Sequence, residues 1–152
     1  MDSLVTMMCA LHRHYTEEPA EPESVRRMLA RWLAADGRLG GITICLKQET
    51  AIGFASTTFA VPGPDFKPVM ILKDLFVVEP ARNAGAGEYI MRFLAKTCLA
   101  NDISRLDLST ESWNGGAMGF YERLGGRFLE QKRFFRFTGP NLEQLAQVGR
   151  RQ

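Results

Sequence analysis

This chain of 152 residues has little of what several classes of protein need. Its three cysteines, Cys9, Cys45 and Cys98, lack the paired spacing of a metal site. No apolar stretch approaches the ~20 residues of a membrane-spanning helix, and no cleavable leader follows the acidic Asp2. The net charge is only +2, which gives no indication of a nucleic-acid surface. We therefore expect a cytoplasmic protein without a bound metal that works on neither a membrane nor a nucleic acid.

The composition is that of an ordinary globular protein. Hydrophobic residues make up 45% of the chain and charged residues 24%. No internal repeat, low-complexity tract or linker interrupts the sequence. A chain of this length can bury one core, so we expect a single domain over residues 1–152.

The spacing of apolar residues predicts alternating helices and strands. Helices are expected at 4–15, at 23–35, at 87–101 and after residue 114, and strands at 42–46, 51–59, 69–78, 105–109 and 132–137. The first two strands read as an antiparallel pair around 47–50. These elements indicate an α/β fold with a mixed, mostly antiparallel sheet and helices on both faces.

The most informative stretch is residues 72–87, LKDLFVVEPARNAGAG, in which an apolar strand runs through a turn into a helix. Such a junction gathers unpaired backbone amides at a helix N-terminus, which is a ready anion site. Glycines allow close approach of an anion, and Asn83 tolerates a positive φ angle. Arg82 adds a guanidinium suited to phosphate. The alternative is an ordinary strand-to-helix turn.

Two better-known phosphate loops do not fit this turn. A dinucleotide fingerprint needs a small residue where the chain has Ile90, although Asp107 lies at the right distance for its acidic partner. A Walker loop needs a Gly-Lys-Ser/Thr triplet, which occurs nowhere in the chain. What remains is an Arg-x-x-Gly-x-Gly turn.

A second motif follows at residues 113–125, WNGGAMGFYERLG. Asn114 is a good helix N-cap, and Gly125 can end the helix in the left-handed region. Ala117, Phe120, Tyr121 and Leu124 fall on one helix face. Phe120 and Tyr121 could both be core aromatics.

The two motifs, in this order and with a helix and a strand between them, resemble the Gcn5-related N-acetyltransferase superfamily over residues 69–145. Finer similarity points to its diamine acetyltransferase-like branch. The resemblance implies that acetyl-CoA is the co-substrate and that Tyr121 protonates the leaving thiolate. It also implies that the fourth and fifth strands splay apart, so that pantetheine pairs with the backbone of Phe76, Val77 and Val78. The residues implied to hold the rest of the cofactor are Arg82, Asn83, Ala84, Gly85, Ala86, Gly87, Glu88 and Asn114.

The implied reaction is direct attack of an amine on the thioester. Because an alkylammonium has a pKa near ~10, a base must accept its proton at neutral pH. Asp74 and Glu111 are the candidate bases. The alternative is that Asp74 is a structural cap and Glu111 a solvated loop acid.

The acceptor is less defined by the sequence. Four glutamates lie within residues 17–23, and an acidic rim there would favour a cationic amine. A solvated loop is the alternative. A polyamine-like amine, an amino acid and an antibiotic all remain open as acceptors. Two further possibilities are a protein N-acetyltransferase and a non-catalytic acyl-CoA-binding module.

One departure from the superfamily concerns the start of the fold. The superfamily usually has a strand before its first helix, whereas this chain begins at the helix. Either that strand is missing or a partner fills its place. We expect a homodimer with residues 132–137 at or near the interface, because Phe and Arg are concentrated there.

Overall fold

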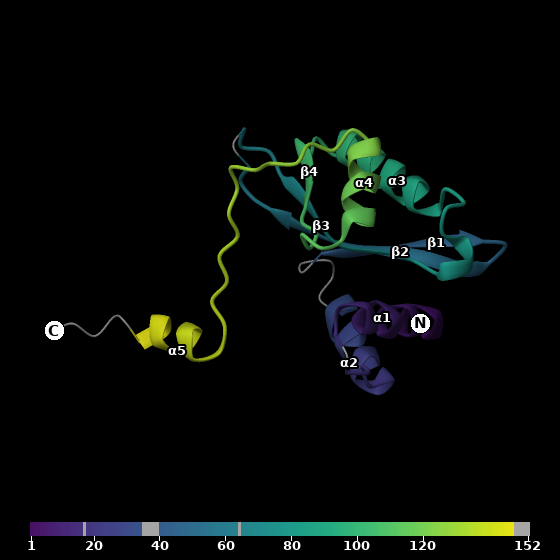
Figure 1. The fold of residues 1–152 in the computed structure, drawn as a ribbon, viewed down its shortest axis with the longest axis horizontal. Helices are drawn as coiled ribbons and strands as arrows, with labels where there is room; N and C mark the ends of the chain where they lie inside the picture. Colours follow the sequence, from purple (N-terminus) through teal and green to yellow (C-terminus); the bar gives the residue numbers. More distant parts are fainter. Residues whose placement is uncertain (17, 35–39, 64, 148–152) are drawn as a thin grey trace. The chain divides into compact units, whose positions relative to one another are not determined.

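The computed structural model describes residues 1–16, 18–34, 40–63 and 65–147. By their contacts these residues fall into two compact units, Met1–Glu111 and Ser112–Gln152, and each is described by itself. The first unit holds the sheet and three of the helices, and the second holds two further helices (Figure 1).

The sheet of the first unit has the spatial order β1-β2-β3-β4. The first three strands, β1 (Gly41–Lys47), β2 (Thr50–Ala60) and β3 (Val69–Val77), pair antiparallel, and β4 (Arg105–Leu108) runs parallel to β3. A two-residue loop joins β1 to β2, and both of its residues, Gln48 and Glu49, have positive φ angles of 47° and 65°. This is the loop geometry that matches the twist of a hairpin. The predicted α/β fold with a mostly antiparallel sheet is confirmed.

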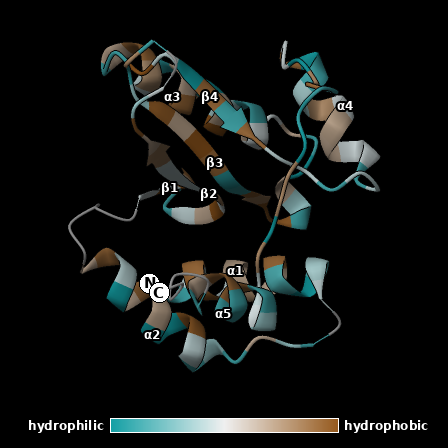
Figure 2. Cartoon of the chain, turned by 90° about the vertical axis from the view of Figure 1, so that its left-hand side faces the viewer, coloured by the Kyte–Doolittle hydropathy of each residue, from teal (hydrophilic) through white to brown (hydrophobic). Residues whose placement is uncertain are grey.

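Helices cover both faces of this sheet (Figure 1). On one face, α1 (Asp2–Tyr15) and α2 (Pro22–Leu33) pack apolar side chains against Phe54 of β2 and Phe76 of β3. On the other face lies α3 (Ala86–Ala100), whose Cys98 sulfur is 3.8 Å from the sulfur of Met70. Figure 2 colours most of β3 as hydrophobic, as expected for a strand covered on both sides.

A bulge inside β3 changes which face its side chains occupy. Ser56 of β2 pairs with Asp74, but the next residue, Thr57, pairs with Leu72, so that Lys73 is the extra residue. Before the bulge Met70 contacts α3, and after it Phe76 contacts α1 and α2. Because side chains alternate along a strand, an unbroken strand would place positions 70 and 76 on the same face. The bulge therefore moves the second half of β3 into register with the α1 and α2 face.

The ladder between β3 and β4 is short. It runs from Val69 opposite Arg105 to Leu72 opposite Leu108, and β3 continues to Val77 beyond it. Residues 73–77 therefore have β2 on one side and no β4 residue on the other. An open edge of this kind is what a splay between these two strands requires.

The second unit contains α4 (Gly115–Arg123) and α5 (Gly139–Gln147). No strand forms at 132–137, so the prediction of a C-terminal strand is wrong for this structure. The aromatic residues of this run favour an extended backbone, but a strand exists only where a neighbouring strand pairs with it. Within the described part of this unit there is no such neighbour.

The remaining predicted elements are confirmed, with small shifts at their ends. Helix α2 begins at Pro22, one residue before the predicted start, because proline is favoured in the first turn. Its predicted end at Ala35 lies outside the described residues. The first element of the described part of the chain is α1. Among the described residues, no helix has both the length and the apolar character needed to cross a bilayer.

Candidate active site

The predicted anion turn has an open backbone. After a short 3-10 helix, η1 (Glu79–Ala81), Asn83 takes a φ angle of 59° and Gly85 one of 85°. The first backbone bond of α3 runs from the amide of Tyr89 to the carbonyl of Gly85, at 2.9 Å. The amides of residues 85–88 come before that bond and have no partner within the helix. A Cβ atom built on Gly85 would meet nothing within 4 Å, so the space beside these amides is open.

Arg82 is held at the end of β3. Its Nε donates to the carbonyl of Val77 at 3.1 Å, and its guanidinium lies 5.9 Å from the centre of the Phe76 ring. The acid in the first turn of α3, Glu88, is paired with Arg92, whose Nη2 lies 2.6 Å from its carboxylate. The guanidinium of Arg82 is thus held against the end of β3, and the carboxylate in the first turn of α3 has its own cationic partner.

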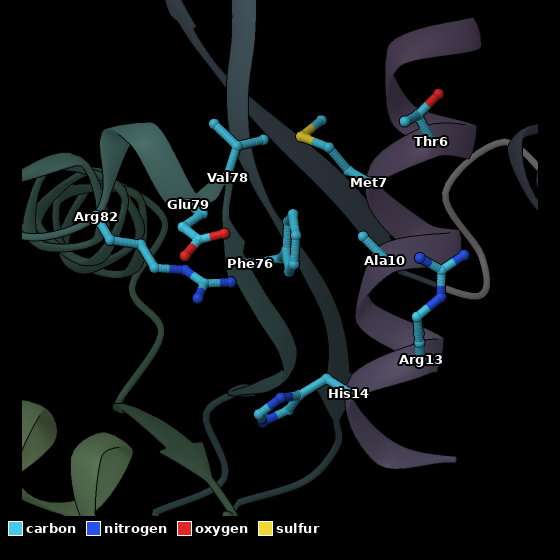
Figure 3. A pocket seen from close by; sticks show the side chains of 9 residues that line it. All are labelled: Thr6, Met7, Ala10, Arg13, His14, Phe76, Val78, Glu79 and Arg82. Atoms are coloured by element: carbon cyan, nitrogen blue, oxygen red, sulfur yellow. The ribbon is translucent and has the colours of Figure 1, made fainter. Parts of the chain in front are cut away.

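A cavity of about 420 Å³ lies beside this turn, within the first unit. That volume is typical of sites for small ligands. Side chains of α1 form one wall, and side chains from the end of β3 and from the turn form the other (Figure 3). The lining residues are Thr6, Met7, Ala10, Arg13, His14, Phe76, Val78, Glu79 and Arg82.

The sequence predicted only one wall of this cavity. Phe76, Val78 and Arg82 belong to the expected cofactor site, whereas Arg13 and His14 of α1 were missed. The only signal for them is a polar, basic end on an otherwise apolar helix, which solvent exposure explains equally well. With Arg13 and Arg82 against the single carboxylate of Glu79, the lining carries a net positive charge even with His14 neutral.

The register of β3 distinguishes among the three backbone positions expected to pair with pantetheine. The amide of Val78 donates to the carbonyl of Ile52 at 2.9 Å, so Val78 faces β2. In an antiparallel ladder this direction alternates, so Phe76 also faces β2 and Val77 faces the open edge. Of the three, Val77 is the residue whose backbone polar groups point to the side that β4 leaves open.

One hydrogen bond and two electrostatic interactions link four residues, the acid cluster: Tyr15, Ser56, Asp74 and Glu111. Ser56 Oγ donates a hydrogen bond to Asp74 Oδ2 from the directly opposite position on β2. Tyr15, the last residue of α1, is 52% exposed, yet partial burial raises the pKa of its phenol. The carboxylates of Asp74 and Glu111 raise that pKa further, because they disfavour a second negative charge nearby. Both predicted acids therefore act on the same tyrosine, which the sequence analysis did not identify.

The second motif folds as predicted within the second unit. Asn114 Oδ1 accepts a hydrogen bond from the amide of Ala117 at 3.1 Å and so caps α4. Gly125, at a φ angle of 88°, follows the end of the helix. Tyr121 lies on α4 with its ring edge-on to Phe120, at 5.2 Å between ring centres. The roles of Asn114 and Tyr121 toward a cofactor stay predictions.

No group of His, Cys, Asp and Glu residues within the described ranges could hold a metal ion. The four groups that the geometry brings together in the first unit are the open amides, the cation at the end of β3, the open strand edge and the acid cluster. These suit an anionic ligand at one end and a cationic ligand at the other.

Comparison with known proteins gives a consistent result. The model of the Acetyltransferase (GNAT) family matches residues 5–126. A curated L-ornithine N5-acetyltransferase of Arabidopsis thaliana is 30% identical over 74 residues, which are 49% of this chain and 32% of that protein. The chain therefore aligns with only about a third of that relative's length.

Solved structures show the same fold. An integron cassette protein from the mobile metagenome of V. cholerae is 30% identical, with a TM-score of 0.83 over 95% of this chain and 90% of that chain. A possible acetyltransferase from Clostridium difficile 630 has a TM-score of 0.78 at 15% identity, over 89% of both chains.

Proposed function

Because the chain belongs to the Acetyltransferase (GNAT) family, we propose that it transfers an acetyl group from acetyl-CoA to a primary amine of a small molecule. The observation that carries this proposal is the end of β3. There an open strand edge leads directly into a turn with four helix amides that have no helical partner. The first can pair with an extended pantetheine arm, and the second can bind a pyrophosphate.

The residues present fit acetyl-CoA. The amides of residues 85–88 supply hydrogen-bond donors, and Gly85 leaves the space beside them open. Arg82 supplies a charge close to them, and Arg13 extends the positive character to the opposite wall of the cavity. Asn83, Ala84 and Glu88 complete the set of turn residues, and Asn114 is the proposed cofactor residue of the second unit.

In the proposed reaction the amine nitrogen forms a bond to the acetyl carbon while the carbon–sulfur bond breaks. The ammonium proton passes to Asp74 or Glu111, directly or through water, before attack. We propose Tyr121 as the general acid whose phenol proton goes to the departing thiolate, which the family resemblance supports. As the adduct collapses, the nitrogen loses its second proton, which restores the Tyr121 phenol directly or through water. The net release is one proton, held by Asp74 or Glu111.

We propose a cationic acceptor, since the carboxylates of Asp74 and Glu111 both lie within electrostatic range of the Tyr15 ring. The Arabidopsis thaliana relative is named for acetylation of L-ornithine, which carries two amines. Ornithine and simple diamines are therefore the first acceptors to test, followed by aminoglycosides.

We also propose a homodimer. Residues 132–137 hold three Phe and two Arg, and Phe134 and Phe135 are about four-fifths exposed, at 79% and 81%. Exposed aromatics of this density are typical of surfaces that a partner covers. Light scattering over a wide concentration range should give twice the mass of one chain. A single-chain mass at every concentration would remove the dimer from the proposal.

Turnover is best tested by the release of free thiol from acetyl-CoA in the presence of single amines. Ornithine, putrescine, spermidine, a neutral amino acid and an aminoglycoside form the first panel. We expect thiol release with at least one cationic amine, and mass spectrometry should show one acetyl group on the acceptor. Acetyl-CoA binding without turnover on any amine would instead favour a non-catalytic acyl-CoA-binding module.

A further inference from the structure

Ser56 is unusual among the described residues, because it is a polar side chain with no exposed surface. It lies on β2 two residues from Phe54, which is equally buried and packs against Phe76. Alanine would fill almost the same volume in this apolar setting. A hydroxyl is tolerated there only if it is hydrogen-bonded, and its partner is Asp74 Oδ2.

Asp74 reaches this face only through the bulge of β3. With Met70 directed to α3, unbroken alternation would direct Asp74 to α3 as well. The extra residue, Lys73, reverses the alternation, so that Asp74 shares a face with Ser56 and Phe76. Bulges are frequent next to active sites, where they redirect a side chain. The bulge in β3 and the hydrogen bond from Ser56 thus both determine where the Asp74 carboxylate lies.

This placement leaves Asp74 within electrostatic range of Tyr15, the last residue of α1, because its carboxylate raises the pKa of the Tyr15 phenol. The carboxylate of Glu111 raises the same pKa. Ser56 engages Oδ2, so Oδ1 is the Asp74 oxygen that this hydrogen bond leaves for another donor.

We propose that Ser56 is a positioning residue, whose hydroxyl fixes the Asp74 carboxylate so that Oδ1 receives the proton of the acceptor ammonium beside Tyr15 and Glu111. This inference rests on the proposed acetyl transfer. In the step, the N–H bond of the ammonium breaks, its proton joins Asp74 directly or through one water, and the electron pair stays on nitrogen for attack. Ser56 keeps its own proton throughout.

The test is a double-mutant cycle with Ser56→Ala, Asp74→Ala and the double variant, measured on the full chain. Thr57→Val is the matched control. It removes the other buried hydroxyl from the adjacent position of the same strand, which faces the opposite side and donates to Gly41. Ser56→Thr is the conservative variant that keeps the hydroxyl.

We expect Ser56→Ala to lower kcat/KM for the acceptor about tenfold, in line with the loss of a hydrogen bond to a charged group. The KM for acetyl-CoA should stay at the parental value. In the Asp74→Ala background the same change should have no further effect, because the group it positions is gone. Ser56→Thr should recover most of the activity, and Thr57→Val should leave it within about twofold.

Ser56→Ala with parental kcat/KM, or with an equal loss in both backgrounds, would overturn the proposal. Urea unfolding of the same four proteins measures the Ser56–Asp74 coupling without any turnover. If the parent acetylates no amine, the proposed function fails and the proton-accepting role of Asp74 fails with it, so that the unfolding cycle tests only the Ser56–Asp74 hydrogen bond. Non-additive midpoints then support it, and additive midpoints refute it.

Discussion

Gly85 offers the sharpest test of the cofactor turn. It has a φ angle of 85°, a Cβ atom built there meets nothing within 4 Å, and it directly precedes α3. Gly85→Asp therefore adds a carboxylate beside the four open amides without a clash. Left-handed backbone costs a non-glycine residue roughly 1 kcal/mol, while a negative charge at a helix N-terminus returns about 0.3–1 kcal/mol. The free energy of unfolding should change by less than about 1 kcal/mol.

Acetyl-CoA affinity should change much more. Two unit charges ~5 Å apart in water repel by about 0.8 kcal/mol, so a pyrophosphate with two charges would lose roughly 1.6 kcal/mol of binding free energy. This corresponds to about a fifteenfold weaker Kd. Since the repulsion is electrostatic, raising the salt concentration should narrow the gap between variant and parent.

Isothermal titration with acetyl-CoA measures this loss directly. Gly85→Asn separates charge from backbone strain, because asparagine has nearly the same shape and no charge. Gly139→Asp is the matched control, since Gly139 also begins a helix with a positive φ angle, 50°, and also has open space around it. Equal affinities for the Asp and Asn variants of Gly85 would show that the pyrophosphate binds elsewhere.

Three further predictions concern other side chains. Tyr121→Phe should lower turnover about a hundredfold or more and leave acetyl-CoA affinity unchanged. The control, Tyr89→Phe at an exposed position of α3, should leave turnover at the parental rate. Equal turnover in both variants would make Tyr121 a packing residue. In a variant in which Tyr89 and Tyr121 are replaced by Phe, so that Tyr15 is the only tyrosine, tyrosinate absorbance should appear at a lower pH after Asp74→Asn, because the Asp74 carboxylate raises the pKa of Tyr15. An unchanged titration midpoint would show that Asp74 does not act on Tyr15. Burial raises the pKa of the Cys98 thiol, so stability from the neutral thiol is full below the unfolded pKa of ~8.5 and falls as pH rises through the folded pKa. Urea unfolding across alkaline pH should show a steeper decline for the parent than for Cys98→Ala, and equal slopes would contradict it.

Local signals were sufficient for most of the first unit. The open turn at 83–87 was predicted from residue types that tolerate positive φ angles, and Asn83 and Gly85 have them. The cap of α4 was predicted from Asn114 alone, because capping depends on one side chain and the next few amides. Such features are decided within a few residues, so the sequence carries them directly.

Features that depend on pairing were not predictable. The bulge in β3 depends on how β2 and β3 align, and the amino-acid sequence of residues 69–77 does not specify Lys73 as the extra residue. The second wall of the cavity depends on how α1 packs on the sheet. The strand predicted at 132–137 is absent for the same reason, because its basic and aromatic residues do not specify a neighbouring strand with which to pair.

The charged side chains near β3 differ in sign between its middle and its end, and the net charge of the whole chain does not reveal this. Asp74 shares its influence on Tyr15 with Glu111, whereas Val78, four residues further on, lines a cavity with Arg13 and Arg82. Val78 directly follows β3, so at ~3.3 Å per residue positions 74 and 78 lie about 13 Å apart along an extended backbone. Such an arrangement suits a reaction between an anionic donor and a cationic acceptor, because each can meet side chains of the opposite sign. The net charge of +2, summed over 19 basic and 17 acidic residues, does not reveal that groups of opposite sign gather at these two places.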